Sequence, residues 1–487
     1  MKYLFLFLFS GLYTLQAQVE KDSLFPNTEV TSIQTDTILG LKNELLDPTM
    51  TLSEFLSYVR KFHPIVKQAN LIITESDVKR LKSRGAFDPK LEVDYDTKQF
   101  KSKEYYDKLN ASFKVPVWYG IGVKANYENN DGDYLNPENN VPNNGLYGLG
   151  ITASIGGGMF MNERMAAVKQ AKNYQKQALE ERKILVNKIL FDAANTYFDW
   201  LQFYNEKNLQ DSFLLNSELR FTAIKSGFIS GEMAAIDTLE ANITVNNRKL
   251  NLEKSTIKYL KSTLQLSTYL WLENNIPVEL NSVIAPDTLT INKVDAVLKT
   301  PIIQTVAFDI KDHPKLKALS FKAENLEIDR KLKFNNLLPK IDAQYNFISE
   351  SFGDNDALGF DNYKAGVKVS VPIFLRKERS DLKLAKIKIE ALNYERTTQE
   401  ITISNKIIAL QQELVSFEKQ IDYSTVLVKD YNTLFRAEQR KFILGESSVF
   451  YVNIRESKLM ESELKYIKLI NSFFKTKAKL YNSLVIY

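Results

Sequence analysis

The stretch PKLEVDYD, Pro89–Asp96, returns 250 positions later as PKIDAQYN, Pro339–Asn346. In the first copy the apolar residues Leu91, Val93 and Tyr95 alternate with acidic ones. Successive side chains of a strand point to opposite faces, so this alternation predicts a strand with one apolar face and one wet face. The sequence therefore predicts a sheet between an apolar environment and water, built from a unit that occurs twice.

The duplication continues on both sides of these strands. KFHPIVKQANL, Lys61–Leu71, matches KDHPKLKALSF, Lys311–Phe321, again 250 positions apart, and these two stretches hold the only 2 histidines of the chain. RFTAIKSGFISGE, Arg220–Glu232, matches LFRAEQRKFILGE, Leu434–Glu446, at an offset of 214. The first copy therefore carries 36 additional residues between these landmarks, which are predicted to form an added hairpin of strands.

The domain organisation follows from this duplication. A first repeat is predicted at 49–272 and a second at 295–487, joined by a linker at 273–294. Each repeat is expected to run from a helix through strands to a very long helix, a turn and a further long helix. The expected helices are 50–84, 163–226, 232–272, 312–335, 380–441 and 447–485, and the expected strands lie within 90–155 and 340–371.

The long helices carry a seven-residue repeat of apolar side chains. In the second copy its members are Ile407, Leu414, Ile421, Val428, Phe435 and Phe442. Such spacing predicts a left-handed coiled coil. Because the segment 380–441 has no proline and no glycine, it predicts one helix of roughly 90 Å at ~1.5 Å per residue. That length is too great for the core of a globular domain.

Composition excludes several classes of protein. Of the 487 residues, 44% are hydrophobic and 25% are charged, which is typical of a folded chain. The net charge of +5 is dispersed and gives no basic stripe for nucleic acid. There is no cysteine, and the histidines lie far apart, so neither a disulfide nor a metal site is predicted. Glycine-rich stretches such as GIGVKAN fit strand bends better than phosphate loops, so no enzyme and no cofactor are expected.

The first residues have the pattern of a cleavable export signal. A lysine is followed by an apolar run from Tyr3 to Leu15 and by Ala17 before a polar segment, which predicts a signal peptide at 1–17. Residues 18–48 are predicted to be an extended amino-terminal segment. No later segment has about 18 uninterrupted apolar residues, so the chain is expected to enter a membrane only as strands.

The turn between the long helices carries the most specific motif. In the first repeat Gly231, Asp237, Leu239 and Ala241 match its spacing, and Ala234 stands where a hydroxyl residue is usual. TLSEFL, the two His-Pro pairs and VPIF before an Arg-rich helix start add to this signal. With a duplicated strand and helix unit behind an export signal, the chain resembles the TolC family of outer-membrane channel proteins over nearly all of its mature length.

The second repeat keeps less of the turn motif. Gly445 and Ser448 fit it, whereas Tyr451, Asn453 and Arg455 depart from it. The resemblance rests on the order of these motifs and on their occurrence in both repeats, and not on any single motif.

The resemblance implies a mixed membrane α/β fold, in which duplicated β-hairpins and long antiparallel coiled-coil helices assemble as a homotrimer. The strands would form one β-barrel in the lipid of the outer membrane of a Gram-negative bacterium, and the helices a periplasmic α-helical tunnel. A sheet of four to six strands leaves unpaired edges in lipid unless neighbouring subunits close it, which agrees with a trimer. The implied function is a passive exit duct of a tripartite efflux or type I secretion system, with a periplasmic adaptor (membrane fusion) protein and an inner-membrane pump as partners.

The resemblance also implies where the adaptor docks. The far tips of the two helical hairpins are the expected docking site, and they are marked by Phe228, Gly231, Phe442, Gly445 and Ser448.

A second implied site is the periplasmic entrance. In the family, acidic residues six and nine places after the second turn glycine narrow the entrance, but Tyr451 and Ile454 occupy those places here. The first repeat offers Asp237 and Glu240 instead. Three copies would set these carboxylates in a ring that selects cations. The alternative is that they are ordinary surface acids near a helix start, where the helix dipole favours them.

Two questions stay open from the sequence. The alternative to a duct is an outer-membrane structural or scaffold protein without transport, although a scaffold has no need of a wet strand face. Four strands per chain would give a trimeric barrel of twelve strands, whereas the added hairpin would raise this to eighteen. The sequence slightly favours a barrel of twelve strands, with the added hairpin as a cap outside the bilayer. The reason is that the helical tunnel has a fixed diameter, which a much wider barrel would fit poorly.

Overall fold

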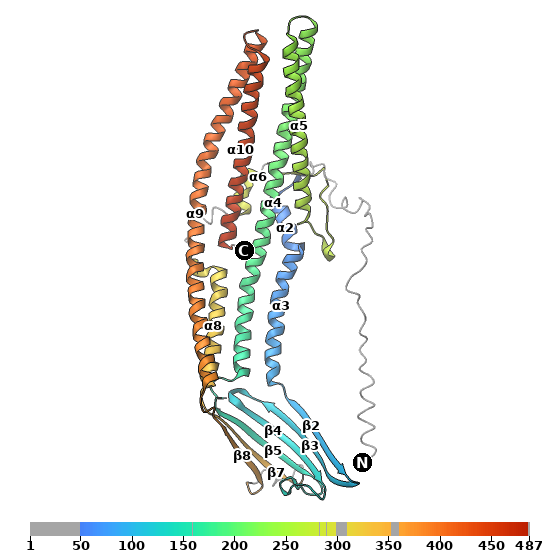
Figure 1. The fold of residues 1–487 in the computed structure, drawn as a ribbon, viewed down its shortest axis with the longest axis vertical. Helices are drawn as coiled ribbons and strands as arrows, with labels where there is room; N and C mark the ends of the chain where they lie inside the picture. Colours follow the sequence, from blue (N-terminus) through green and yellow to red (C-terminus); the bar gives the residue numbers. More distant parts are fainter. Residues whose placement is uncertain are drawn as a thin grey trace. The chain divides into compact units, whose positions relative to one another are not determined.

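The computed structural model describes residues 49–157, 159–281, 283–288, 290–298, 309–351 and 360–485. The signal peptide predicted at 1–17 and the segment predicted at 18–48 lie outside these ranges. The unit Pro48–Tyr487 holds all of the elements described below, and Figure 1 shows them in sequence colours.

Both repeats follow the same order of elements. The helices of the first repeat are α2 (Leu52–Phe62), α3 (Pro64–Arg84), α4 (Glu163–Ile229) and α5 (Ala235–Ser267). Those of the second are α8 (Pro314–Asn335), α9 (Arg376–Ile443) and α10 (Val449–Leu484). The two long helices α4 and α9 have 67 and 68 residues. The added length of the first repeat therefore does not lie in its long helix.

The helix expected at 50–84 is interrupted at His63. A proline disfavours helical backbone in the residue before it, and His63 accordingly has a ψ of 131° before Pro64 begins α3. The Nδ1 atom of His63 accepts a hydrogen bond from the N–H of Ile65 at 3.2 Å. In the second repeat His313 accepts from the N–H of Lys315 at 3.0 Å. Both histidines are therefore N-caps, which explains why the chain repeats them.

The apolar heptad series of α9 is packed against α10. Leu414 of this series is buried with the neighbouring Leu410 in one cluster with side chains of α10, and Phe435 is buried in another. The remaining members of the series are partly buried. The seven-residue spacing thus identified the side of α9 that contacts its partner helix, and this part of the expected coiled coil is confirmed.

The strands form one antiparallel sheet in the order β2-β3-β4-β5-β7-β8. Their bounds are β2 (Lys90–Phe100), β3 (Lys103–Pro116), β4 (Ile121–Asp131), β5 (Leu146–Gly156), β7 (Lys340–Ser349) and β8 (Tyr363–Ser370). In Figure 1 the sheet lies where α3, α4, α8 and α9 end or begin. The sheet passes from the first repeat to the second where β5 pairs with β7.

The added hairpin of the first repeat is β3 and β4, and it lies inside the sheet between β2 and β5. A tight turn with left-handed backbone at Lys101 and Ser102 connects β2 to β3, and another at Tyr119 and Gly120 connects β3 to β4, whereas the longer segment 132–145 leads from β4 to β5. The hairpin was expected to cap a twelve-stranded barrel outside the bilayer, whereas in the structure it is an integral part of the sheet. The reason is the register, because β3 is paired from Lys103 to Pro116 along β2 and β4 and leaves no length free for a cap.

The segment predicted as a linker, 273–294, packs on the helices. It contains β6 (Ala285–Pro286), which pairs in parallel with β1 (Thr49–Met50), and it leads into α6 (Thr290–Val297). The Tyr197 hydroxyl of α4 donates to the Met50 carbonyl at 2.8 Å, and burial raises the pKa of Tyr197 to about 12. Leu280 and Val294 complete this core. The sequence predicted only a linker here and could not show which of its apolar residues are buried against the helices.

Candidate functional site: a two-faced sheet and two hairpin tips

One face of the sheet carries apolar side chains from all six strands. The register aligns one row of this face as Leu91, Phe113, Ala125, Leu149, Phe347 and Tyr363. The side chains of this face are largely uncovered by the described residues, with Leu91 73% and Val367 71% exposed. A contiguous exposed apolar surface of this kind marks a place of contact with lipid or with another protein.

The opposite face of the sheet is polar. One of its rows runs Lys90, Lys114, Lys124, Gly150, Asn346 and Lys364. The edge strand β2 adds Glu92, Asp94 and Asp96 to this face. In these two rows the alternation first seen in PKLEVDYD separates apolar side chains from polar ones and glycine, whereas Asp107, Asn129 and Asp131, farther from the helices, lie on the otherwise apolar face.

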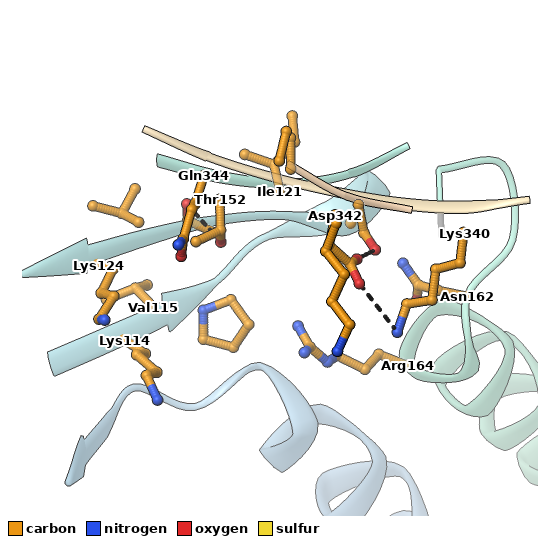
Figure 2. A pocket seen from close by; sticks show the side chains of 18 of the residues that line it. Lys114, Val115, Ile121, Lys124, Thr152, Asn162, Arg164, Lys340, Asp342 and Gln344 are labelled. Carbon is orange, nitrogen blue, oxygen red and sulfur yellow. Dashed lines mark hydrogen bonds and ion pairs between the residues drawn. The ribbon is translucent and has the colours of Figure 1, made fainter. Parts of the chain in front are cut away.

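A cavity of about 1040 Å³ lies under the polar face, where the strands meet the helices. In Figure 2, Lys114 and Lys124 come from neighbouring strands on one side of it, and Arg164 enters from the start of α4. Asp342 of β7 accepts a hydrogen bond from Ser154 of β5 and lies 3.7 Å from the Nζ atom of Lys340. The cavity is therefore lined by charged groups from both repeats.

The two hairpin tips have the same backbone structure. Gly231 and Gly445 have φ angles of +80° and +78°, which favour glycine. The next N–H donates to the third carbonyl from the helix end, in the pairs Glu232–Gly227 at 2.8 Å and Glu446–Lys441 at 2.9 Å. This is the Schellman arrangement that ends a helix. A side chain at either glycine would meet nothing within 4 Å, so the glycines are needed for the turn and not for space.

The two phenylalanines of the predicted docking site are not equivalent. Phe228 is 45% exposed, whereas Phe442 is half-buried and packs in the cluster that includes Ile224 and Val449. The exposed apolar side chains at the second tip include Ile443 and Leu444. Heptad spacing placed Phe442 on the packed side of α9, and that signal could have shown that it is not a surface residue.

The structure places the candidate entrance residues at the start of α5. Asp237 lies in the first turn of this helix, which has Ala234 as its N-cap and no side-chain cap. Glu240 accepts a hydrogen bond from the Nδ2 atom of Asn453 on α10 at 3.2 Å. Ser448, the N-cap of α10, makes no side-chain cap either. Of the two carboxylates, only Glu240 is therefore joined by a hydrogen bond to the other hairpin.

A buried charged cluster, which the sequence did not indicate, joins the two helical hairpins. Glu456 of α10 is fully buried and forms ion pairs with Arg220 of α4 and, at 3.2 Å, with Arg248 of α5. Arg220 also donates to the Oδ1 atom of Asn453 at 3.0 Å. The arginines lie more than two hundred positions from Glu456 in the sequence, so no local pattern could reveal them.

None of the helices in the described ranges combines the length and the apolar character that a membrane crossing requires. The same ranges contain no grouping of three or more histidine or acidic side chains able to hold a metal ion. The two buried histidines are accounted for as helix caps.

Several solved structures resemble this one at low sequence identity. CusC, studied for conformational changes accompanying folding and transmembrane channel formation, has a TM-score of 0.64 at 11% identity, covering 89% of this chain and 91% of CusC. The open state of the MtrE outer membrane channel of Neisseria gonorrhoeae has a TM-score of 0.63 at 12% identity, covering 89% and 88%. The CmeC outer membrane channel of Campylobacter jejuni has a TM-score of 0.61 at 11% identity, covering 89% and 85%.

No family model matches the sequence, and no curated protein sequence matches it either. At this level of identity the likeness shows the fold alone. The chain has the fold of outer-membrane channel proteins, as its resemblance to the TolC family predicted.

Proposed function

We propose that the protein is a subunit of a passive exit duct in the outer membrane of a Gram-negative bacterium, serving a tripartite efflux or type I secretion system. The observation that carries this proposal is the six-stranded sheet with one apolar and one polar face. An apolar face toward lipid and a polar face toward water are the arrangement of a membrane barrel. The outer membrane channels of the same fold support the proposal.

The duct is proposed to be a homotrimer, because a single chain leaves both edges of the sheet, β2 and β8, without a partner strand among the described residues. Neighbouring strands alternate in direction and their number is even, so β8 of one subunit would meet β2 of the next in antiparallel orientation. Lys364 and Lys368 on the polar face of β8 would then approach the acidic side chains of β2. Opposite charges across a strand pair stabilise it.

Six strands per chain give eighteen in such a trimer. Barrels of 16 to 18 strands leave an aqueous channel, whereas barrels of about 8 strands are filled by side chains or hold one small ligand. The continuous pairing of the added hairpin supports the wider barrel over the twelve strands that the sequence slightly favoured.

The helical hairpins are proposed to reach the partner proteins. Exposed apolar side chains beside the turn glycines, among them Ile229 and Ile443, support adaptor docking at both tips. The adaptor would connect the duct to an inner-membrane pump. Asp237 and Glu240 remain the candidates for the entrance ring, and the chain is proposed to have no enzymatic activity of its own.

Single-channel conductance in a planar bilayer tests the duct. The purified protein in mild detergent is expected to run as a trimer and to give stepwise conductance after insertion. An outer-membrane scaffold is the competing function, and it would give a folded trimer that inserts without conducting. A folded monomer with intact strands would contradict the proposed closure of the sheet.

A further inference from the structure

Three lysines stand side by side on the polar face of the sheet. The register places Lys90 opposite Lys114 and Lys114 opposite Lys124 on three adjacent strands. Like charges directly opposite each other destabilise a strand pair. Of the three, Lys114 is the one that forms an ion pair within the described part of the chain, and its partner is Glu92. Lys90 and Lys124 form no ion pair with any described residue.

The cavity beneath this row collects further positive charge. Its basic lining residues are Lys90, Lys114, Lys124, Arg164, Lys340 and Lys368. Its acidic lining residues are Glu92, Glu163 and Asp342. Two of these acids already have a lysine partner, Glu92 with Lys114 and Asp342 with Lys340. The cavity therefore has a surplus of positive charge that its own carboxylates do not neutralise.

The positive surplus is confined to the end of the sheet nearest the helices. Farther along the polar face, Asp94 and Asp96 stand opposite Asn110 and Lys108. Glu128 lies in the same part of the face, 3.5 Å from the Nζ atom of Lys364. The polar face thus has a basic layer beside the helices and a mixed, more acidic layer toward the far turns.

We infer that the basic layer is an anion-binding site and that the duct carries anionic solutes. This inference rests on the proposed function, because it requires the polar face to line a water-filled passage. Three subunits would set three copies of the lysine row around that passage. Rings of lysine and arginine select anions in pores, and low-dielectric walls strengthen the field of such a ring at its centre.

The test measures the reversal potential of the full-length protein in a planar bilayer across a potassium chloride gradient. The dilute side is kept at about 0.1 M, where the field of the lysines is screened only beyond ~10 Å. The double variant Lys90→Gln/Lys124→Gln is expected to move the reversal potential toward cation preference. Lys108→Gln is the matched control, since it removes the same charge from the same face in the other layer. Its shift is expected to be clearly smaller than that of either single variant in the basic layer.

Citrate, a multivalent anion, provides a direct probe of binding. Citrate added to the wild-type channel is expected to reduce the single-channel current. The double variant is expected to need about tenfold more citrate for the same reduction, because charge-assisted contacts with the lysines are lost. Lys108→Gln should keep the block of the wild type. Circular dichroism and trimer mobility show whether each variant is folded, and the single variant Lys124→Gln serves if the double variant is not.

The outcomes separate this inference from the proposed function. A folded trimer that never conducts contradicts the duct itself. Conductance without block of the wild type by citrate overturns the anion-binding layer and leaves the duct intact. Equal shifts for Lys108→Gln and the basic-layer variants also overturn it, because the charge of the passage would then act as a whole and not through one layer.

Discussion

The two repeats begin and end their helices with the same backbone motifs, but they differ in where their charged residues lie. Both have a histidine cap before a proline, and both end their long helix at a glycine with positive φ. The buried Glu456 of the second repeat corresponds, at the offset of 214, to Asn242 of the first, which is exposed. Arg220 and Arg248 correspond to Leu434 and Ser462. The charged cluster therefore has no counterpart in the other repeat.

This difference has a physical reason. Helix caps and tight turns depend on the backbone of a few neighbouring residues, so both copies need the same residue types. The contact between the two hairpins joins unlike surfaces, where a carboxylate on one side requires a guanidinium on the other. At this contact the carboxylate comes from the second repeat and both guanidinium groups from the first, so the corresponding positions of the two copies differ.

The largest expected effect is at the charged cluster. Glu456→Ala leaves Arg220 and Arg248 buried without their carboxylate, and breaking a buried ion pair in this way costs about 3–5 kcal/mol. The corresponding Asn242→Ala should change stability by less than about 0.5 kcal/mol, because this side chain is exposed. Thermal unfolding followed by helical circular dichroism measures both. Equal effects at the two positions would contradict the asymmetry between the repeats.

A smaller loss of stability, equal at the two hairpin tips, is expected when the turn glycines are replaced. Valine at φ near +80° costs about 1–2 kcal/mol at each tip, since a Cβ atom crowds the following carbonyl in left-handed backbone. The double variant Gly231→Val/Gly445→Val should therefore lose transport while its sheet stays folded. Asparagine tolerates this backbone, so Gly231→Asn/Gly445→Asn is the matched control.

Drug resistance or release of a secreted protein, at normal expression of the channel, reports transport in these glycine variants. Full transport by the valine variant would speak against docking at the tips. A large loss in the asparagine control would show that the exposed surface of the tip, and not its turn, is what the partner contacts.

The histidine caps should each contribute about 1 kcal/mol, with a pH dependence of defined sign. Burial lowers the pKa of both His63 and His313 from 6.5. The unfolded chain then binds protons more readily than the native protein, so stability is complete above pH about 6.5 and falls as the pH decreases below it. Protonation would also convert Nδ1 from an acceptor into a donor and break the cap.

Asparagine variants separate the capping hydrogen bond from the titration of the imidazole. His63→Asn and His313→Asn keep a capping acceptor and remove the titration, so their unfolding midpoints should vary less between pH 7 and 5 than that of the wild type. Alanine variants should lose the cap at every pH. An unchanged acid dependence in the double asparagine variant would assign it to other groups.

The smallest effect on stability is expected at the candidate entrance. Asp237→Asn/Glu240→Gln should change stability by about 0.5 kcal/mol or less, because neither carboxylate is deeply buried. If the carboxylates form a ring, the double variant should shift the reversal potential away from cation preference, opposite to the lysine variants. Unchanged conductance and selectivity would identify them as surface acids of the first repeat alone.

How much the sequence could predict differs from element to element. The alternation around Leu91 predicted the two-faced sheet, and the heptad of α9 predicted the side on which Leu414 and Phe435 are packed. The same heptad placed Phe442 in the packed series, but the tip motif was interpreted as exposing it. Periodicity reports which face of an element is buried, and it is more reliable than proximity to a turn.

The sequence by itself determined the features that short-range physics controls. Period-two and period-seven patterns fix which side of a strand or helix is apolar, a proline fixes the break at His63, and glycine permits the left-handed turns. Tertiary structure alone decided the place of the β3–β4 hairpin within the sheet, the contacts of 273–294 with β1 and with Tyr197, and the meeting of Glu456 with Arg220 and Arg248. Each of these features depends on contact between segments that are far apart in the sequence. Many such contacts are compatible with the same local sequence pattern, and only the packing of the whole chain selects one of them.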